Sequence, residues 1–131
     1  MLVKNYTAHE FLARYDLLSS GRRILNAGSS NTRYGSCCIN VDIQAKPNVD
    51  VVCDIHELPS SLGEFDAIVC NAVLQYCQDP DKVAREFYRV LKPGGLVFVD
   101  APCAHLFCAD PSDRLRFFED SLRSNLSQFH I

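Results

Sequence analysis

The sequence predicts an α/β protein built on an open, mostly parallel sheet of about five strands, with helices on both faces of the sheet. Two observations predict this class. Five short apolar segments of strand length follow one another along the chain, and two of them, 65–70 and 96–100, are apolar almost throughout, as strands covered on both faces are. Segments with apolar residues at helical spacing alternate with these strands. The length of 131 residues fits a single domain, residues 1–131.

Three segments are predicted to be helices. The first, residues 8–20, has Gly21 as its expected C-cap. Its apolar residues at helical spacing are Phe11, Leu12, Tyr15 and Leu18. The third, residues 112–129, lies in the tail. Its apolar residues are Leu115, Phe118, Leu122 and Leu126. Both patterns are typical of helices that bury one face.

The second predicted helix has the clearest start signal. Asp79 is the expected N-cap and Pro80 the first helical residue, because an aspartate side chain accepts from free backbone amides and proline needs no partner there. Its buried stripe is Val83, Phe87, Val90 and Leu91. Residues 92–95, with the sequence KPGG, are expected to end it and turn the chain.

The predicted strands are residues 23–27, 38–42, 49–54, 65–70 and 96–100. About ten residues separate the first two strands and about six separate the second from the third, whereas a parallel crossover takes roughly a dozen. We therefore expect trimmed helices on one side of the sheet. The third strand would lie at an edge or away from the second.

Composition and charge exclude several other classes. A formal net charge of -3 disfavours a surface that binds nucleic acid. No apolar stretch approaches the roughly 18 residues of a membrane helix, and no signal-peptide core follows the start, so we expect a cytoplasmic protein without a membrane partner. Seven cysteines, an odd number with no CxxC pair, predict reduced thiols and no metal site.

Polar residues follow the predicted strands at their carboxyl ends, where open α/β sheets bind ligands. After the first strand, Gly28 lets a ligand approach the backbone closely. Asp42 ends the second strand, where an acid can accept both hydroxyls of a ribose. Asp54 ends the third and could accept from an exocyclic amine, with the Ile55 amide donating to a ring nitrogen. Asn71 follows the fourth strand. This pattern favours an adenosine, and the lack of a GxGxxG loop argues against a bound diphosphate.

Each of these residues also has a purely structural interpretation. Gly28 could be a turn glycine and Asp42 a solvated strand end. Asp54 or Asn71 could cap the turn that follows it. These alternatives stay open at the level of the sequence.

Residues 24–100 resemble a class I S-adenosylmethionine-dependent methyltransferase. The matching segments are 24–29 for the glycine motif, 40–42 for the acid of the second strand, 53–59 for the third-strand motif, 65–71 for the fourth strand, and 85–96. The last is the most specific of them. The tail from 105 to 118 is similar to a small bacterial, type-11-like subgroup that also shortens the first crossover.

The resemblance implies a Rossmann-like fold and S-adenosyl-L-methionine as the cofactor. The residues expected to bind it are Asn26, Gly28, Asp42, Asp54, Ile55 and Asn71. Gly28 would pack on the methionine part and Asp42 would hold the ribose diol. Asp54 and Ile55 would meet adenine, and the Asn71 carbonyl would lie near the amino group. Asn26 stands where the family usually has an acid, so weaker cofactor binding is expected.

The resemblance also implies methyl transfer to a small-molecule or glycan-type acceptor. His105 is the candidate catalytic base, because it follows the fifth strand on the side where a substrate would lie. The candidate substrate-binding residues are Gln75, Asp110 and Asp113.

The strands predicted from this sequence do not include the last two that the family usually has. The fifth strand would then be a sheet edge, and that edge or the tail helix could form a homodimer. Two other classes of function stay open. One is a cofactor-binding domain that has lost turnover, suggested by Asn26. The other is an interaction module that pairs through the exposed fifth strand.

Overall fold

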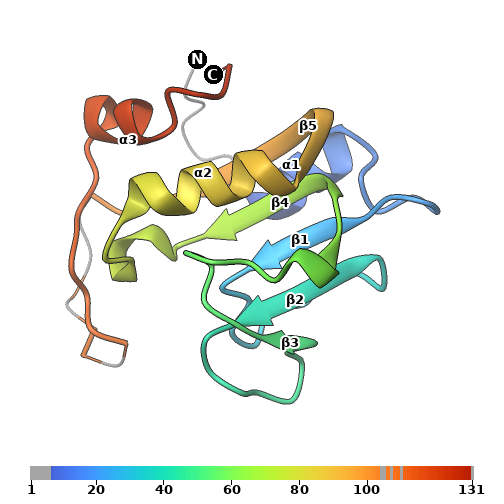
Figure 1. The fold of residues 1–131 in the computed structure, drawn as a ribbon, viewed down its shortest axis with the longest axis horizontal. Helices are drawn as coiled ribbons and strands as arrows, with labels where there is room; N and C mark the ends of the chain where they lie inside the picture. Colours follow the sequence, from blue (N-terminus) through green and yellow to red (C-terminus); the bar gives the residue numbers. More distant parts are fainter. Residues whose placement is uncertain (1–6, 104–105, 107, 110, 131) are drawn as a thin grey trace.

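A five-stranded parallel sheet with the order β3-β2-β1-β4-β5 forms the centre of the computed structural model, which describes residues 7–103, 106, 108–109 and 111–130 (Figure 1). The strands are β1 (Ile24–Ala27), β2 (Cys38–Asp42), β3 (Val51–Val52), β4 (Phe65–Asn71) and β5 (Leu91–Asp100). Every neighbouring pair of strands is parallel. The predicted α/β class is confirmed.

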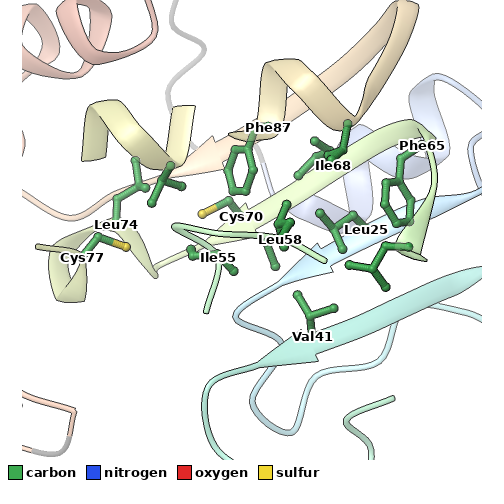
Figure 2. Packing of buried hydrophobic residues seen from close by; sticks show 14 of the residues in the cluster. Leu25, Val41, Ile55, Leu58, Phe65, Ile68, Cys70, Leu74, Cys77 and Phe87 are labelled. Atoms are coloured by element: carbon green, nitrogen blue, oxygen red, sulfur yellow. The ribbon is translucent and has the colours of Figure 1, made fainter. Parts of the chain in front are cut away.

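Helices cover both faces of this sheet. On one face, α1 (Ala8–Arg14) packs Phe11 and Leu12 against strand residues such as Ile24. On the other face, α2 (Pro80–Val90) packs Phe87 against a larger cluster that includes Leu25 (Figure 2). Ile24 and Leu25 are adjacent in β1 and serve opposite faces, as the pleat of a strand requires. The short helix α3 (Glu119–Asn125) lies on the α2 side (Figure 1).

The start of α2 is as predicted. Asp79 is the N-cap, and its side chain accepts a hydrogen bond from the Lys82 amide at 2.9 Å. Val83, Phe87 and Val90 are buried, whereas Leu91 already belongs to β5. None of the helices in the described part of the chain is long and apolar enough to cross a membrane.

The first helix is shorter than predicted. It ends at Arg14, and Asp16 adopts a left-handed backbone conformation with φ of 49°. The Leu17 amide then donates to the Leu12 carbonyl, which turns Leu17 into the core. Tyr15 and Leu18, expected on the buried face, are instead 46% and 43% exposed.

The tail differs most from the prediction, because only Glu119–Asn125 is helical. The segment before it bonds to the rest of the chain instead of to itself. The Arg114 and Leu115 amides donate to the Gln75 carbonyl, and the Phe117 amide donates to the Pro102 carbonyl. As a result Phe117 is buried, and Phe118, which was predicted to be core or subunit interface, is 73% exposed.

Two connections carry no α-helix, as expected from their lengths. Residues 28–37 join β1 to β2, and residues 43–50 join β2 to β3. β3 is an edge strand that lies directly beside β2. It is shorter than predicted at both ends. Before its start, the Asp50 carboxylate, rather than a backbone carbonyl, accepts from the Asn40 amide at 2.8 Å.

The other edge is β5, which pairs only with β4 among the described residues. Its start is irregular, because Phe65 pairs with Leu91 while Ala67 pairs with Leu96. The sequence predicted that residues 92–95 would separate helix from strand. In the structure they form a bulge within the strand, which absorbs the extra residues without ending the pairing.

Candidate functional site

A cavity of about 400 Å³ lies at the carboxyl edge of the sheet. Figure 1 shows β1, β2 and β4 ending at this edge. The loops after these strands and after β3 line the cavity, and the tail also contributes to its wall. All six residues predicted to bind a cofactor are among its lining residues: Asn26, Gly28, Asp42, Asp54, Ile55 and Asn71.

The glycine loop after β1 is held by close packing. Gly28 has a φ of 68°, and a Cβ at this position would lie 2.5 Å from the nearest methyl group of Val73. The glycine is therefore required by the approach of Val73 as well as by its backbone conformation. Beside it, the Ser29 amide donates to the Val41 carbonyl, while the buried Ser29 hydroxyl has no partner among the described residues.

Asp42 is fixed at the end of β2 by backbone donors. One of its carboxylate oxygens accepts from the Ser30 amide at 2.8 Å, and the other accepts from the Gln44 amide at 2.9 Å. Only 9% of the residue is exposed. Lys46 reaches the same loop, where its ammonium donates to the Ser30 hydroxyl at 2.8 Å. Each Asp42 oxygen keeps a lone pair that a ligand hydroxyl could use.

Asp54 lies after β3 and is paired with His56. Its Oδ1 accepts from the His56 amide at 2.9 Å and lies 2.7 Å from the Nδ1 of the same imidazole. Burial acts to raise the pKa of Asp54, but the hydrogen bonds from His56 outweigh it and lower the pKa below its ordinary value. The neighbouring Ile55 is buried, and its amide donates no hydrogen bond to a described residue.

Asn26 takes part in a buried chain of amides. Its side-chain nitrogen donates to the Thr32 carbonyl and to Asn40 Oδ1, both at 2.9 Å. The Asn40 side-chain nitrogen in turn donates to Asp50 Oδ2 at 3.0 Å. Asn26 and Asn40 are direct neighbours across β1 and β2. A carboxylate in place of the Asn26 amide would face two acceptors, so the neutral residue is the one that fits here.

Asn71 ends β4 on the other side of the cavity. It is exposed and pairs in register with Asp100 of β5. The next residue, Ala72, has a φ of 54°, and its amide donates to the Asp100 carbonyl at 2.8 Å. This turn directs the chain back, so that Val73 reaches Gly28.

The two predicted substrate residues that the structure describes, Gln75 and Asp113, both hold the tail in place. Gln75 is 1% exposed and does not line the cavity. Its side-chain nitrogen donates to the Ala72 carbonyl at 2.7 Å, and its backbone carbonyl accepts the hydrogen bonds that anchor the tail. Asp113 is also an anchor, since it accepts from the Cys108 amide at 2.6 Å and from Arg116 at 2.9 Å. Both residues hold the tail so that Cys108 and Pro111 line the cavity. His105 and Asp110 lie outside the described residues.

Several lining residues were not predicted. His56 lies within the third-strand motif, and its position between two acids was a signal that could have found it. Tyr34, Lys46 and Tyr76 lie in loops whose path only the structure shows. Val73 follows the fourth strand, and nothing in the sequence connects it to Gly28.

Two thiols of the cavity, those of Cys53 and Cys77, hold their protons. Burial raises the pKa of Cys53, and burial together with the charge of Asp54 raises the pKa of Cys77 to about 12. All seven cysteines are free. Among the residues that the structure describes, no three histidine, cysteine or acidic side chains are placed to hold a metal ion.

The chain matches a known family in sequence and a solved structure in fold. A family model described as a methyltransferase domain matches residues 30–99, more than half of the chain. The chain is similar to the N-terminal domain of EvdMO1 in a crystal structure with SAH bound, with a TM-score of 0.58, 18% identity, and coverage of 93% of this chain and 74% of that one. At this identity the likeness shows the fold.

Two curated relatives are also methyltransferases by name. A ubiquinone biosynthesis O-methyltransferase of Xanthomonas oryzae pv. oryzae (strain PXO99A) is 31% identical over 111 residues, covering 66% of this chain and 45% of the relative. An arsenite methyltransferase of Aquipseudomonas alcaligenes is 47% identical over 45 residues, covering 34% of this chain and 13% of the relative. The chain therefore spans less than half the length of these relatives.

Proposed function

Because the chain belongs to the family of methyltransferase domains, we propose that it binds S-adenosyl-L-methionine in this cavity and transfers the methyl group to a small-molecule or glycan-type acceptor. The observation that carries the proposal is the convergence of Gly28, Asp42 and Asp54 on one cavity of about 400 Å³. Gly28 follows β1, Asp42 ends β2 and Asp54 follows β3, so the parallel arrangement of these strands brings the three residues to one edge of the sheet.

The donors and acceptors of the cavity fit an adenosine ligand. Asp42 and Asp54 offer carboxylate oxygens for a ribose diol and an exocyclic amine. The Ile55 amide and the Ser29 hydroxyl are donors without a partner among the described residues. A buried polar group without a hydrogen bond costs about 1–3 kcal/mol, so a ligand that accepts from these donors would recover part of that cost.

The chain's own residues would act mainly by position. When bound, S-adenosylmethionine supplies an activated methyl group on a sulfonium. The strand-end acids would hold the nucleoside, and the tail residues Cys108 and Pro111 would help to close the cavity wall. Fixing two reactants in a reactive geometry contributes roughly 7–11 kcal/mol to a rate enhancement. A base is needed only for an acceptor that carries a proton at the working pH, and His105 stays the candidate for that role.

Calorimetric titration with S-adenosylhomocysteine tests the binding part of the proposal. We expect saturable binding, and an affinity roughly tenfold to a hundredfold lower for Asp42→Asn, because one charged acceptor is lost. Glu57→Gln is the matched control, since Glu57 is an exposed acid two residues from Ile55 that does not line the cavity. No heat with the wild type at millimolar ligand would refute the proposal.

A second candidate is a domain that binds the cofactor without turning it over. The arrangement of Asn26 favours it, because an amide occupies a position where the family usually has an acid. An acceptor screen that measures S-adenosylhomocysteine production distinguishes the two candidates. Product formation with any acceptor above the protein-free rate supports transfer, and binding without product across the screen supports the second candidate.

A further inference from the structure

His56 connects the third-strand acid to the start of α2. Its side chain lines the cavity and is 19% exposed. On one side it reaches Asp54, and on the other it reaches the backbone of Asp79, the N-cap of α2. No other described residue forms hydrogen bonds with both Asp54 and Asp79.

The two contacts of the imidazole define its proton position. The Asp79 backbone amide donates to Nε2 at 3.2 Å. Because a backbone N–H is only a donor, Nε2 must act as an acceptor and carries no proton. The proton is therefore on Nδ1, which lies 2.7 Å from Asp54 Oδ1 and donates to it. The position of α2 thus determines which tautomer of His56 faces the acid.

The same contacts fix the orientation of the Asp54 carboxylate. Oδ1 receives two hydrogen bonds, from the amide and from the imidazole of His56. Oδ2 receives none from the described residues and remains the acceptor that a ligand could use. Because both hydrogen bonds are made to the same oxygen, the carboxylate cannot rotate without losing both of them.

Further hydrogen bonds hold the backbone that follows His56 against α2. The Leu58 amide donates to Glu86 Oε2 at 2.7 Å, and Arg89 donates to the Leu58 carbonyl at 2.9 Å. Glu86 and Arg89 also pair with each other at 2.7 Å. These contacts anchor the backbone after His56, and before it the Cys53 amide donates to the Asp42 carbonyl at 2.9 Å. Substitution of His56 alone should therefore leave the path of the chain unchanged.

We propose that His56 is a positioning residue that makes the cavity selective for 6-aminopurine over 6-oxopurine nucleosides. This inference rests on the proposed function. An exocyclic amine donates to the fixed Asp54 oxygen, whereas a 6-oxo group would place an acceptor against it. Without His56 the carboxylate could rotate away or accept water, and the penalty against the 6-oxo ligand would fall.

Two substitutions separate the two contacts of the imidazole. In His56→Asn the side-chain nitrogen takes the place of Nδ1 and can still donate to Asp54. In His56→Gln the side-chain oxygen can take the place of Nε2 and accept from Asp79, but the donor to Asp54 is lost. Dissociation constants of S-adenosylhomocysteine and its 6-oxo counterpart, S-inosylhomocysteine, are measured for both variants and for the wild type. Thermal unfolding midpoints are measured alongside.

We expect His56→Asn to keep the wild-type selectivity ratio within about threefold and His56→Gln to lower it by about tenfold. A structural role alone would make selectivity follow the unfolding midpoints. An unchanged ratio in His56→Gln, or an equal loss in both variants, would overturn the inference while leaving the proposed function intact. Absence of S-adenosylhomocysteine binding to the wild type would overturn both.

The tautomer gives a readout that needs no ligand. Nitrogen-15 chemical shifts of the imidazole in the free protein should identify His56 as the Nδ1-protonated form, the less common neutral tautomer. In Asp54→Asn the donor on Nδ1 loses its charged partner, and the shifts should move. An Nε2-protonated His56 in the wild type would contradict the inference directly.

Discussion

The two ends of the cavity hold their polar groups in different ways. At the β2–β3 end, Asp42 and Asp54 are carboxylates, and each accepts hydrogen bonds from backbone amides. At the β1–β4 end, the described lining residues carry no charged side chain, and Asn26 and Asn71 are amides. The cavity is therefore charged where it would hold a nucleoside and neutral at its other end.

The comparison shows what decides whether an acid fits at a strand end. Asp42 has a backbone donor on each carboxylate oxygen, so an acid at this strand end finds hydrogen-bond partners. Asn26 faces two acceptors, Asn40 Oδ1 and the Thr32 carbonyl. The negative charge of this network lies instead on Asp50, where Arg33 approaches to 3.5 Å. Strand position alone does not set the residue type; the neighbouring donors and acceptors do.

The largest effect is expected from Gly28→Ala at the neutral end. The added Cβ would overlap with Val73, and the residue would be held at a φ of 68°. Overpacking and a left-handed alanine together should lower the free energy of unfolding by about 2–4 kcal/mol. Chemical denaturation measures this loss.

The double variant Gly28→Ala/Val73→Ala is the control for that experiment. Removing the Val73 methyl groups relieves the overlap but not the backbone strain, so it should recover stability relative to Gly28→Ala despite its own loss of packing. If Gly28→Ala proved as stable as the wild type, the close packing of the glycine loop would be wrong.

A smaller but more specific effect is expected from Asn26→Asp, which restores the acid usual in the family. At neutral pH the buried charge would face two acceptors and should destabilise the protein by about 2–3 kcal/mol, without improving ligand affinity. Burial favours the protonated acid, so the deficit should shrink as the pH falls.

Stability curves of Asn26→Asp and of the wild type at several pH values check this prediction. Asn40→Asp is a useful companion, because it places a carboxylate next to Asp50 and should be destabilising for the same reason. A stable Asn26→Asp protein that binds the ligand more tightly would show that the β1 end accepts a charge after all.

The smallest change in the free energy of unfolding is expected from Asp54→Asn, and this change depends on pH. Because its pKa is lowered in the folded protein, the stabilisation it provides is present above its ordinary pKa and is lost as the pH falls through the lower folded value. Wild type should therefore lose stability relative to Asp54→Asn on acidification from about pH 4 downward. With 52% of the side chain exposed, solvent screening keeps the difference below about 1 kcal/mol.

Unfolding free energies of the two proteins between neutral and acidic pH give this difference directly. Other acids lower in pKa, such as Asp66 and Glu86, contribute equally to both proteins and cancel. A difference that does not change with pH would mean that His56 does not stabilise the Asp54 charge.

Much of the sheet and the cavity could be predicted from local signals. β2 has the predicted bounds, and α2 begins where Asp79 and Pro80 placed it. The six predicted lining residues could be identified because open α/β sheets bind ligands at the carboxyl ends of their strands, and parallel strands bring these ends to one edge whatever their side chains. The helix predicted for the whole tail was wrong, because the apolar spacing fits a helix, whereas the carbonyl of Gln75, far away in the sequence, accepts from the Arg114 and Leu115 amides.

Apolar periodicity, caps and the direction of the chain were enough to predict five strands, the main helix and the acids at the strand ends. Three features could not be predicted from these signals: Val73 requires Gly28 to be a glycine, Asn40 requires Asn26 to be neutral, and α2 sets the tautomer of His56. Each of these depends on atoms brought together from distant segments at hydrogen-bond or van der Waals distance, and no local pattern encodes that distance.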